Sequence, residues 1–135
     1  MAETLTACRR DGFVSTIAGR KRWIRGVRDF QSLDPNRRKM LIEPERMAVN
    51  TVIQGSAADM IKLAMIALYK QMKQTPLRAK MLLQIHDELI FEVHPEDLDS
   101  LRKIVVELMT TVVPLDVPLR VDTKSGINWE ACEPL

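Results

Sequence analysis

The sequence predicts a single α+β domain in which helices pack on one face of a small antiparallel sheet. Apolar residues recur with helical spacing over residues 44–73 and again over 95–113. Short apolar runs flank tight turns within residues 13–24 and 80–93, as two β-hairpins would. Because helices and strands are segregated along the chain, a layer of helices on an antiparallel sheet is favoured.

The N-terminal part is expected to form a helix, a hairpin and an irregular segment, at residues 2–10, 13–24 and 25–44. Gly12 follows the helix, as a glycine often does just beyond a helix end. Ala18-Gly19 is the expected hairpin turn, between strands at 13–17 and 20–24. In the charged segment Asp34-Pro35-Asn36 is a turn signal, and a helical turn is expected at 37–41.

The remaining elements are a long helix, an acidic hairpin, a second helix and a closing strand, expected at about 44–73, 80–93, 95–113 and 119–122. Gly55 in the long helix costs about 1 kcal/mol relative to alanine, which indicates a close neighbour or a slight bend. His94-Pro95 begins the second helix, with proline in the first turn and acidic residues near the positive end of the helix dipole.

Composition and charge limit the possible functions. The 135 residues are 46% hydrophobic and suit one globular domain with a modest core. The aromatic content of 4% disfavours base stacking as the main binding mechanism. Residues 1–46 hold 11 Lys and Arg against 6 Asp and Glu, whereas residues 47–135 hold 9 against 12. A basic front half and an acidic back half suit a chain that contacts phosphates with one part and a metal with the other.

Targeting signals are not evident in the sequence. Cys8 and Cys132 lack metal-binding spacing and are interpreted as free thiols in a reducing cytosol. The N-terminus lacks the apolar stretch of a signal peptide. Charged residues interrupt every apolar segment, so no membrane span is expected and a cytoplasmic location is predicted.

Two adjacent carboxylates, Asp87 and Glu88, lie between the apolar runs of the second hairpin and are therefore expected at its tip. Apart from Lys80, no Lys or Arg is nearby in sequence to act as a counter-ion. Hard carboxylate oxygens suit Mg²⁺, which makes this turn a candidate metal site. The alternative is an acidic turn that only meets solvent, since Asp is an ordinary turn residue.

A polar stripe runs along the predicted long helix. Arg46, Asn50 and Gln54 follow at intervals of four residues and share one face. If the helix is largely buried, these groups need partners. They could be donors to a nucleic acid, because Arg and amide side chains contact base edges and phosphates. The alternative is a stripe exposed to water.

Taken together, these segments resemble the C-terminal part of the polymerase domain in family A DNA polymerases, the bacterial DNA polymerase I type. Gln84–Val93 resembles the family's third polymerase motif, and Glu45–Asp59 the long palm helix before it. Gly19–Arg22 is similar to the basic hairpin after the fingers. Val117–Val121 and Gly126–Trp129 resemble the closing strand and tail. The four motifs follow in the family's order through the whole chain.

The resemblance implies a role for each candidate residue. Asp87 would be a ligand of the two catalytic Mg²⁺ ions, with Glu88 supporting the metal site. His86 would contact the primer terminus, and Arg46, Asn50 and Gln54 the primer–template minor groove. Arg20 and Arg22, with Lys21 between them, would contact phosphates, unless this charge run is only a solvated face.

The resemblance also implies that parts are missing. Residues 1–135 would be the C-terminal part of a palm domain, without the family's first carboxylate motif and without the fingers helix that holds the deoxynucleoside triphosphate. We therefore expect a truncated piece of a DNA-directed DNA polymerase that is inactive alone. The alternative is a non-catalytic module, derived from a palm domain, that binds nucleic acid or another partner.

Overall fold

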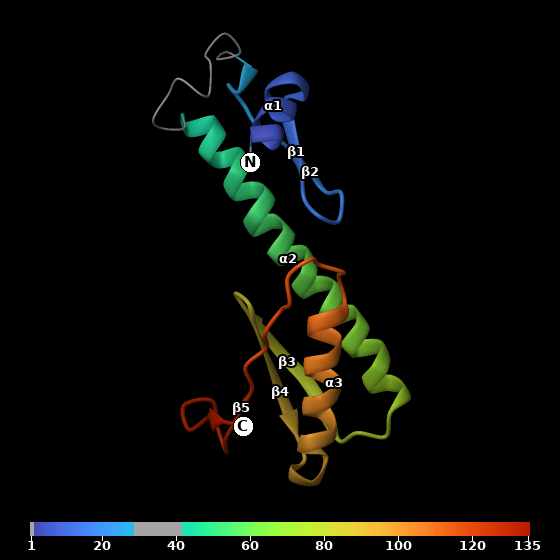
Figure 1. The fold of residues 1–135 in the computed structure, drawn as a ribbon. Helices are drawn as coiled ribbons and strands as arrows, with labels where there is room; N and C mark the ends of the chain where they lie inside the picture. The colour runs from blue at the N-terminus through green and yellow to red at the C-terminus, as the bar shows by residue number, and fades with distance from the viewer. Residues whose placement is uncertain (1, 29–41) are drawn as a thin grey trace. The chain divides into compact units, whose positions relative to one another are not determined.

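The computed structural model describes residues 2–28 and 42–135, and the chain divides into two compact units, Met1–Asp59 and Met60–Leu135. The described elements follow the predicted order of helix, hairpin, long helix, hairpin and helix (Figure 1). The fold is therefore α+β, as predicted. The helical turn expected at 37–41 lies outside the described residues.

The first unit is built from α1 (Ala2–Asp11), β1 (Phe13–Ser15), β2 (Lys21–Trp23) and the N-terminal half of α2 (Glu43–Gln74). Gly12 adopts a φ of 82° and donates its N–H to the Cys8 carbonyl, 2.7 Å away, so it ends α1 as predicted. The two strands pair antiparallel but are shorter than expected. The core residues are Leu5, Cys8, Val14, Ile24, Val27 and Ala48, with Val49 and Val52 packed against them.

A buried ion pair joins α1 to the start of α2. The Arg9 guanidinium contacts the Glu45 carboxylate, and Glu45 is fully buried. The second oxygen of Glu45 accepts the N–H of Ile42 at 3.0 Å, which satisfies a backbone donor at the beginning of the helix. Glu45 therefore both caps α2 and orients it on α1.

Helix α2 confirms the predicted span of 44–73. It is also the one helix in the described part of the chain that is long and apolar enough to cross a membrane by length and composition. The expectation that charges interrupt every such segment was therefore wrong, because Asp59 and Lys62 are too few to do so. Composition alone is weak evidence for a span, and 22% of the apolar window is buried within the fold.

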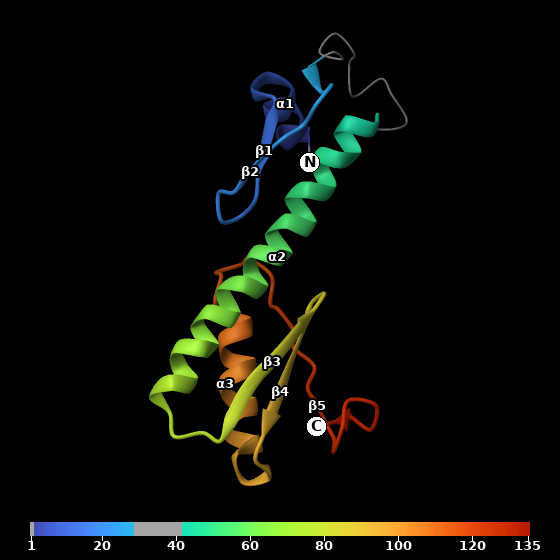
Figure 2. The same ribbon diagram turned by 180° about the vertical axis from the view of Figure 1, so that it is seen from behind.

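The second unit packs two helices on one face of the acidic hairpin. The hairpin strands β3 (Ala79–Ile85) and β4 (Glu88–Val93) are followed by η3 (Pro95–Asp97) and α3 (Leu98–Thr111). Leu68, Leu101 and Val105 form the buried core, against which Met81, Leu89, Phe91 and Val93 of the hairpin pack. Figure 2 shows α3 and the C-terminal half of α2 beside the strands.

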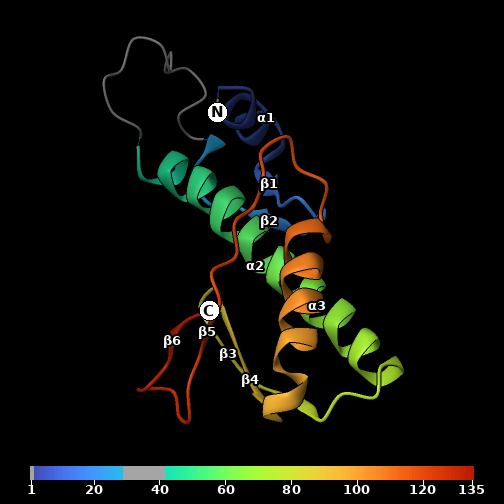
Figure 3. The ribbon, with the colours of Figure 1, turned by 60° about the horizontal axis from the view of Figure 1, so that its bottom comes forward.

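Two details of the predicted sheet were wrong. Within residues 2–28 and 42–135 the strands form three separate two-stranded sheets rather than one. No strand forms at 119–122; instead β5 (Lys124–Ser125) pairs with β6 (Glu133–Pro134) in the C-terminal tail (Figure 3). A strand exists only where backbone groups find a paired neighbour, and the alternating pattern of residues 119–122 does not specify that neighbour.

Two leucines of α2 test the second core. Leu68 is fully buried, whereas Leu63 is 39% exposed. We expect Leu68→Ala to lower the free energy of unfolding by about 2–5 kcal/mol through lost burial and a residual cavity. Leu63→Ala, the matched control on the same helix, should cost clearly less. Urea denaturation followed by circular dichroism measures both, and equal losses would contradict the core assignment.

Candidate functional site

The tip of the acidic hairpin is a two-residue turn formed by His86 and Asp87. Ile85 pairs with Glu88 across this turn. His86 has a φ of 52°, in the left-handed region, and is the one described residue other than glycine with positive φ. The Gln84 side-chain amide donates to the His86 carbonyl at 2.6 Å, which helps to hold this uncommon conformation. No pattern in the sequence predicts this role of Gln84.

The two carboxylates are brought to one exposed place by the turn. Asp87 occupies the tip and Glu88 begins β4, and both side chains are exposed. Their oxygens have the right chemistry for Mg²⁺, which takes six oxygen ligands. Within residues 2–28 and 42–135, however, no group of three or more His, Cys, Asp or Glu could hold a metal. The turn therefore fits as part of a ligand set that other groups would complete.

The hairpin presents the turn on a base held by packing. Its inward face contributes Ala79, Met81, Leu89, Phe91 and Val93 to the second core. A β-bulge interrupts the register between Met81 and Leu83. Leu82 and Leu83 are each 50% exposed, so this hairpin also presents apolar side chains to solvent.

At its far end the hairpin is tied to the start of α3. Asp97 accepts from the backbone N–H of Arg78 at 3.0 Å and from its Nε at 2.8 Å. The side-chain hydrogen bond from Arg78 lowers the pKa of Asp97, with the backbone hydrogen bond adding to the effect. The pKa of Asp97 is lower in the folded than in the unfolded chain. Its hydrogen bonds therefore stabilise the fold at pH values above the unfolded pKa, and this stabilisation is lost as pH falls through the folded pKa.

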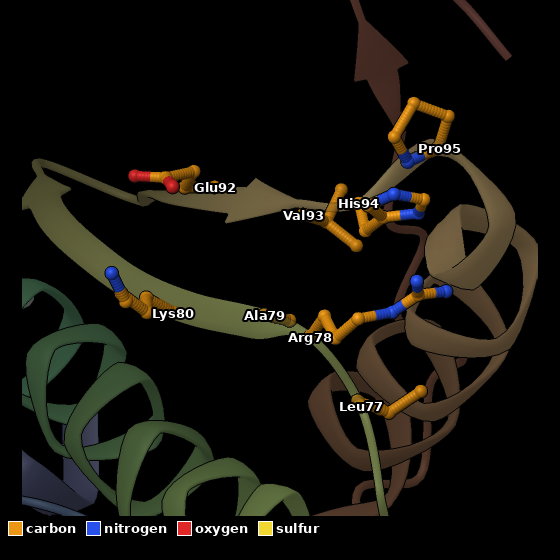
Figure 4. A pocket seen from close by; sticks show the side chains of 8 residues that line it. All are labelled: Leu77, Arg78, Ala79, Lys80, Glu92, Val93, His94 and Pro95. Atoms are coloured by element: carbon orange, nitrogen blue, oxygen red, sulfur yellow. The ribbon is translucent and has the colours of Figure 1, made fainter.

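A hollow of about 550 Å³ lies beside this tie (Figure 4). Two of its polar lining residues, Arg78 and His94, already have structural partners. Arg78 binds Glu96 and Asp97, and His94 Nδ1 accepts the N–H of Glu96 at 3.4 Å, which confirms His94 as a helix-start residue. The hollow therefore belongs to the support of the hairpin.

The polar stripe of α2 meets solvent. Arg46, Asn50 and Gln54 are all exposed, and Arg46 forms an ion pair with Glu43 one turn earlier. Of the two possibilities considered for the stripe, this part of α2 shows the one exposed to water, since Ile53 between the stripe residues is also 62% exposed. The three side chains are therefore available to a ligand, and their contact with DNA stays a prediction.

Arg20 and Arg22 of the first hairpin are both held by α2. Arg20 pairs with Asp59 at 2.9 Å and donates to the Gly55 carbonyl at 3.1 Å. Arg22 donates to the Thr51 hydroxyl at 3.1 Å. These partners were not predicted. The Arg20 side chain is still 57% exposed, so it could meet a phosphate while it keeps its carboxylate partner.

Gly55 explains how the hairpin loop approaches α2. A Cβ at this position would lie 2.7 Å from Thr16 Cγ2. Thr16 is buried, and its hydroxyl accepts the N–H of Arg20 at 3.1 Å. The neighbouring Ser56 hydroxyl accepts the N–H of Ile17 at 2.9 Å. The close neighbour predicted for Gly55 is therefore confirmed, and it is the loop of the first hairpin.

Comparison with known proteins agrees with these features. The family model for DNA polymerase family A matches residues 1–131. The chain belongs to this family.

Among its relatives, the DNA polymerase I of Mycobacterium leprae (strain TN) is 43% identical over 97% of this chain. That of Bacillus subtilis (strain 168) is also 43% identical, over 96%. The chain spans 14% of the length of each. The structure of the POL domain of Pol1 from M. smegmatis, in complex with DNA primer-template and dNTP, is 41% identical. The two structures align with a TM-score of 0.73, and the alignment covers 88% of this chain and 20% of the M. smegmatis chain.

The contact between Thr16 and Gly55 can be tested by substitution. Gly55→Ala should lower the free energy of unfolding by about 1–3 kcal/mol, because overpacking outweighs the better helix propensity of alanine. Thr16→Ser removes the clashing methyl but keeps the hydroxyl. In that background Gly55→Ala should be neutral or stabilising. Urea unfolding of the wild type, the two single variants and the double variant completes this double-mutant cycle. An equal loss of stability from Gly55→Ala in both backgrounds would contradict this explanation.

Proposed function

We propose that this chain is part of a DNA-directed DNA polymerase, to which it contributes a carboxylate turn and a row of primer–template contacts. The observation that carries the proposal is the exposed Asp87-Glu88 pair on a packed hairpin, in a chain of family A. The M. smegmatis relative, solved with primer-template and dNTP, supports DNA and deoxynucleoside triphosphates as partners. A location in the bacterial cytosol or nucleoid is part of this proposal, because it follows from the proposed role in DNA synthesis.

In this function the chain's own residues position the reacting groups. Asp87 would hold Mg²⁺ through its carboxylate, and Glu88 would add negative charge beside it. Two bound Mg²⁺ ions would supply charge neutralisation while the primer 3′-oxygen displaces pyrophosphate from the α-phosphate of the deoxynucleoside triphosphate. His86, at the left-handed position of the turn, would contact the primer terminus.

The stripe on α2 suits recognition that is independent of sequence. The minor groove presents the purine N3 and pyrimidine O2 acceptors at similar positions in every base pair. Arg46, Asn50 and Gln54 offer donors along one exposed helix face. Such donors can test the geometry of a base pair without reading its identity, as copying requires.

The remaining ligands and the triphosphate-binding groups would come from other polypeptide. The described residues offer two carboxylates at the turn, and the chain spans 14% of its relatives' length. The exposed Leu82 and Leu83 also suit a hairpin that packs against further structure. By itself the 135-residue chain is expected not to extend a primer.

We expect the chain to bind duplex DNA weakly, without sequence preference and with a measurable dependence on salt. Few phosphate contacts give a shallow slope of log affinity against log salt, roughly one unit per contact. Replacing Arg46, Asn50 and Gln54 together by alanine should weaken binding more than His94→Ala, the control. Fluorescence anisotropy with labelled duplexes measures this. Binding unaffected by ionic strength would count against the proposal.

A chimera tests the catalytic role. The chain replaces the matched segment of the Bacillus subtilis DNA polymerase I, and primer extension is measured in single turnover at saturating Mg²⁺. The chimera should extend primers, and Asp87→Ala should reduce the rate by about 10²-fold or more through lost charge stabilisation. Glu88→Ala should lose less.

Stability measurements separate catalysis from folding in this experiment. Asp87 is exposed, so Asp87→Ala should change the free energy of unfolding by no more than about 0.5 kcal/mol. A folded chimera without activity would favour a non-catalytic module instead. Near-normal turnover of Asp87→Ala, or a rate loss matched by unfolding, would remove Asp87 from the metal site.

A further inference from the structure

The first hairpin has two chemically different faces. Val14 and Arg22 pair across the strands; Val14 is buried, and Arg22 bonds to Thr51 of α2. Side chains alternate along a strand, so Phe13, Lys21 and Trp23 share the opposite face. That face is not explained by packing on α2.

An aromatic pair with a cation beside it occupies this outer face. The Phe13 and Trp23 rings meet edge to face, with centroids 5.2 Å apart and planes at 66°. The Lys21 ammonium lies 4.6 Å from the Phe13 centroid. Trp23 is nevertheless 68% exposed. The edge-to-face contact with Phe13 therefore leaves most of Trp23 accessible to solvent.

The surroundings of Trp23 are strongly basic. A hollow of about 330 Å³ is lined by Trp23 together with Gly12, Ile24, Arg25, Gly26 and Arg28. Both arginines are exposed, and Arg28 is held in place by a 2.6 Å hydrogen bond to the Asp11 carbonyl. Of the seven Lys and Arg within residues 9–28, Arg9, Arg20 and Arg22 bond to groups on α2, and the other four accompany one acidic residue, Asp11.

We propose that Trp23 is a stacking platform for an unpaired base of single-stranded DNA, with Arg25 and Arg28 contacting the adjoining phosphates. An exposed indole stacks on any base, and basic side chains beside it follow the backbone. An apolar protein partner would leave Arg25 and Arg28 beside Trp23 without an anionic group, whereas the phosphates of a nucleic acid supply one. The proposal rests on the proposed function only for the choice of DNA, and it concerns unpaired rather than duplex DNA.

The chain contains its own control. Trp129 is 58% exposed, similar to Trp23, but it lies in the C-terminal tail beside Glu130 and near Glu133. If exposure alone caused binding, both tryptophans would respond to DNA. If the basic surroundings are needed, only Trp23 would respond.

The test is tryptophan fluorescence of the 135-residue chain titrated with a short oligothymidylate. Trp129→Phe leaves Trp23 as the single reporter, and Trp23→Phe leaves Trp129. We expect saturable quenching with the Trp23 reporter and none with Trp129.

Trp23→Ala should weaken single-strand binding about 10-fold, measured by anisotropy of a labelled oligonucleotide, and duplex binding less than about 2-fold. Arg25→Ala should reduce the salt slope by about one unit.

Several outcomes would overturn the platform. One is quenching of Trp129 equal to that of Trp23. The others are a Trp23→Ala variant that binds the single strand with unchanged affinity, or one that loses as much affinity for duplex as for the single strand. Circular dichroism confirms folding, and Trp23→Phe, which keeps a ring beside Phe13, should bind better than Trp23→Ala. Wild-type chain that binds the single strand but not duplex would refute the primer–template proposal while leaving the platform intact.

Discussion

Helix α2 is anchored by the buried ion pair between Arg9 and Glu45, and the features offered for function lie on this helix or on elements packed against it. Removing one partner of a buried pair costs about 3–5 kcal/mol, because a charge is left without compensation. The first unit depends most on this contact, since Glu45 also accepts the Ile42 N–H at the start of the helix. The polar stripe begins at the next residue, Arg46, so its first member is positioned by the same turn.

Function and stability make opposite demands at the tip of the second hairpin. Asp87 and Glu88 place two like charges side by side, and His86 holds a left-handed backbone that side chains other than glycine rarely adopt. Such strain persists when the surrounding structure determines it. Here the hydrophobic face of β4 and the hydrogen bond from Gln84 provide that support. The free-energy cost of the turn is thus offset by contacts that lie away from the two carboxylates.

The basic run of the first hairpin divides between two tasks. Arg20 and Arg22 orient the hairpin on α2, whereas Lys21 and Trp23 face away from it. The alternation of a β-strand makes this division possible, because neighbouring residues point to opposite faces. In sequence Arg20, Lys21 and Arg22 form one uninterrupted charge cluster, which gives no indication that its two arginines bond to α2.

Local patterns were enough to predict the helices, the two hairpins and the turn that carries Asp87, because periodicity, glycine and proline act through neighbouring residues. The family and its candidate residues also followed from motif order. The partners of Arg20, Arg22 and Glu45, the loop against Gly55 and the pairing of the C-terminal tail were decided by tertiary structure. Each depends on groups far apart in the chain, and a side chain's sequence neighbours do not specify which distant donor, acceptor or strand will reach it.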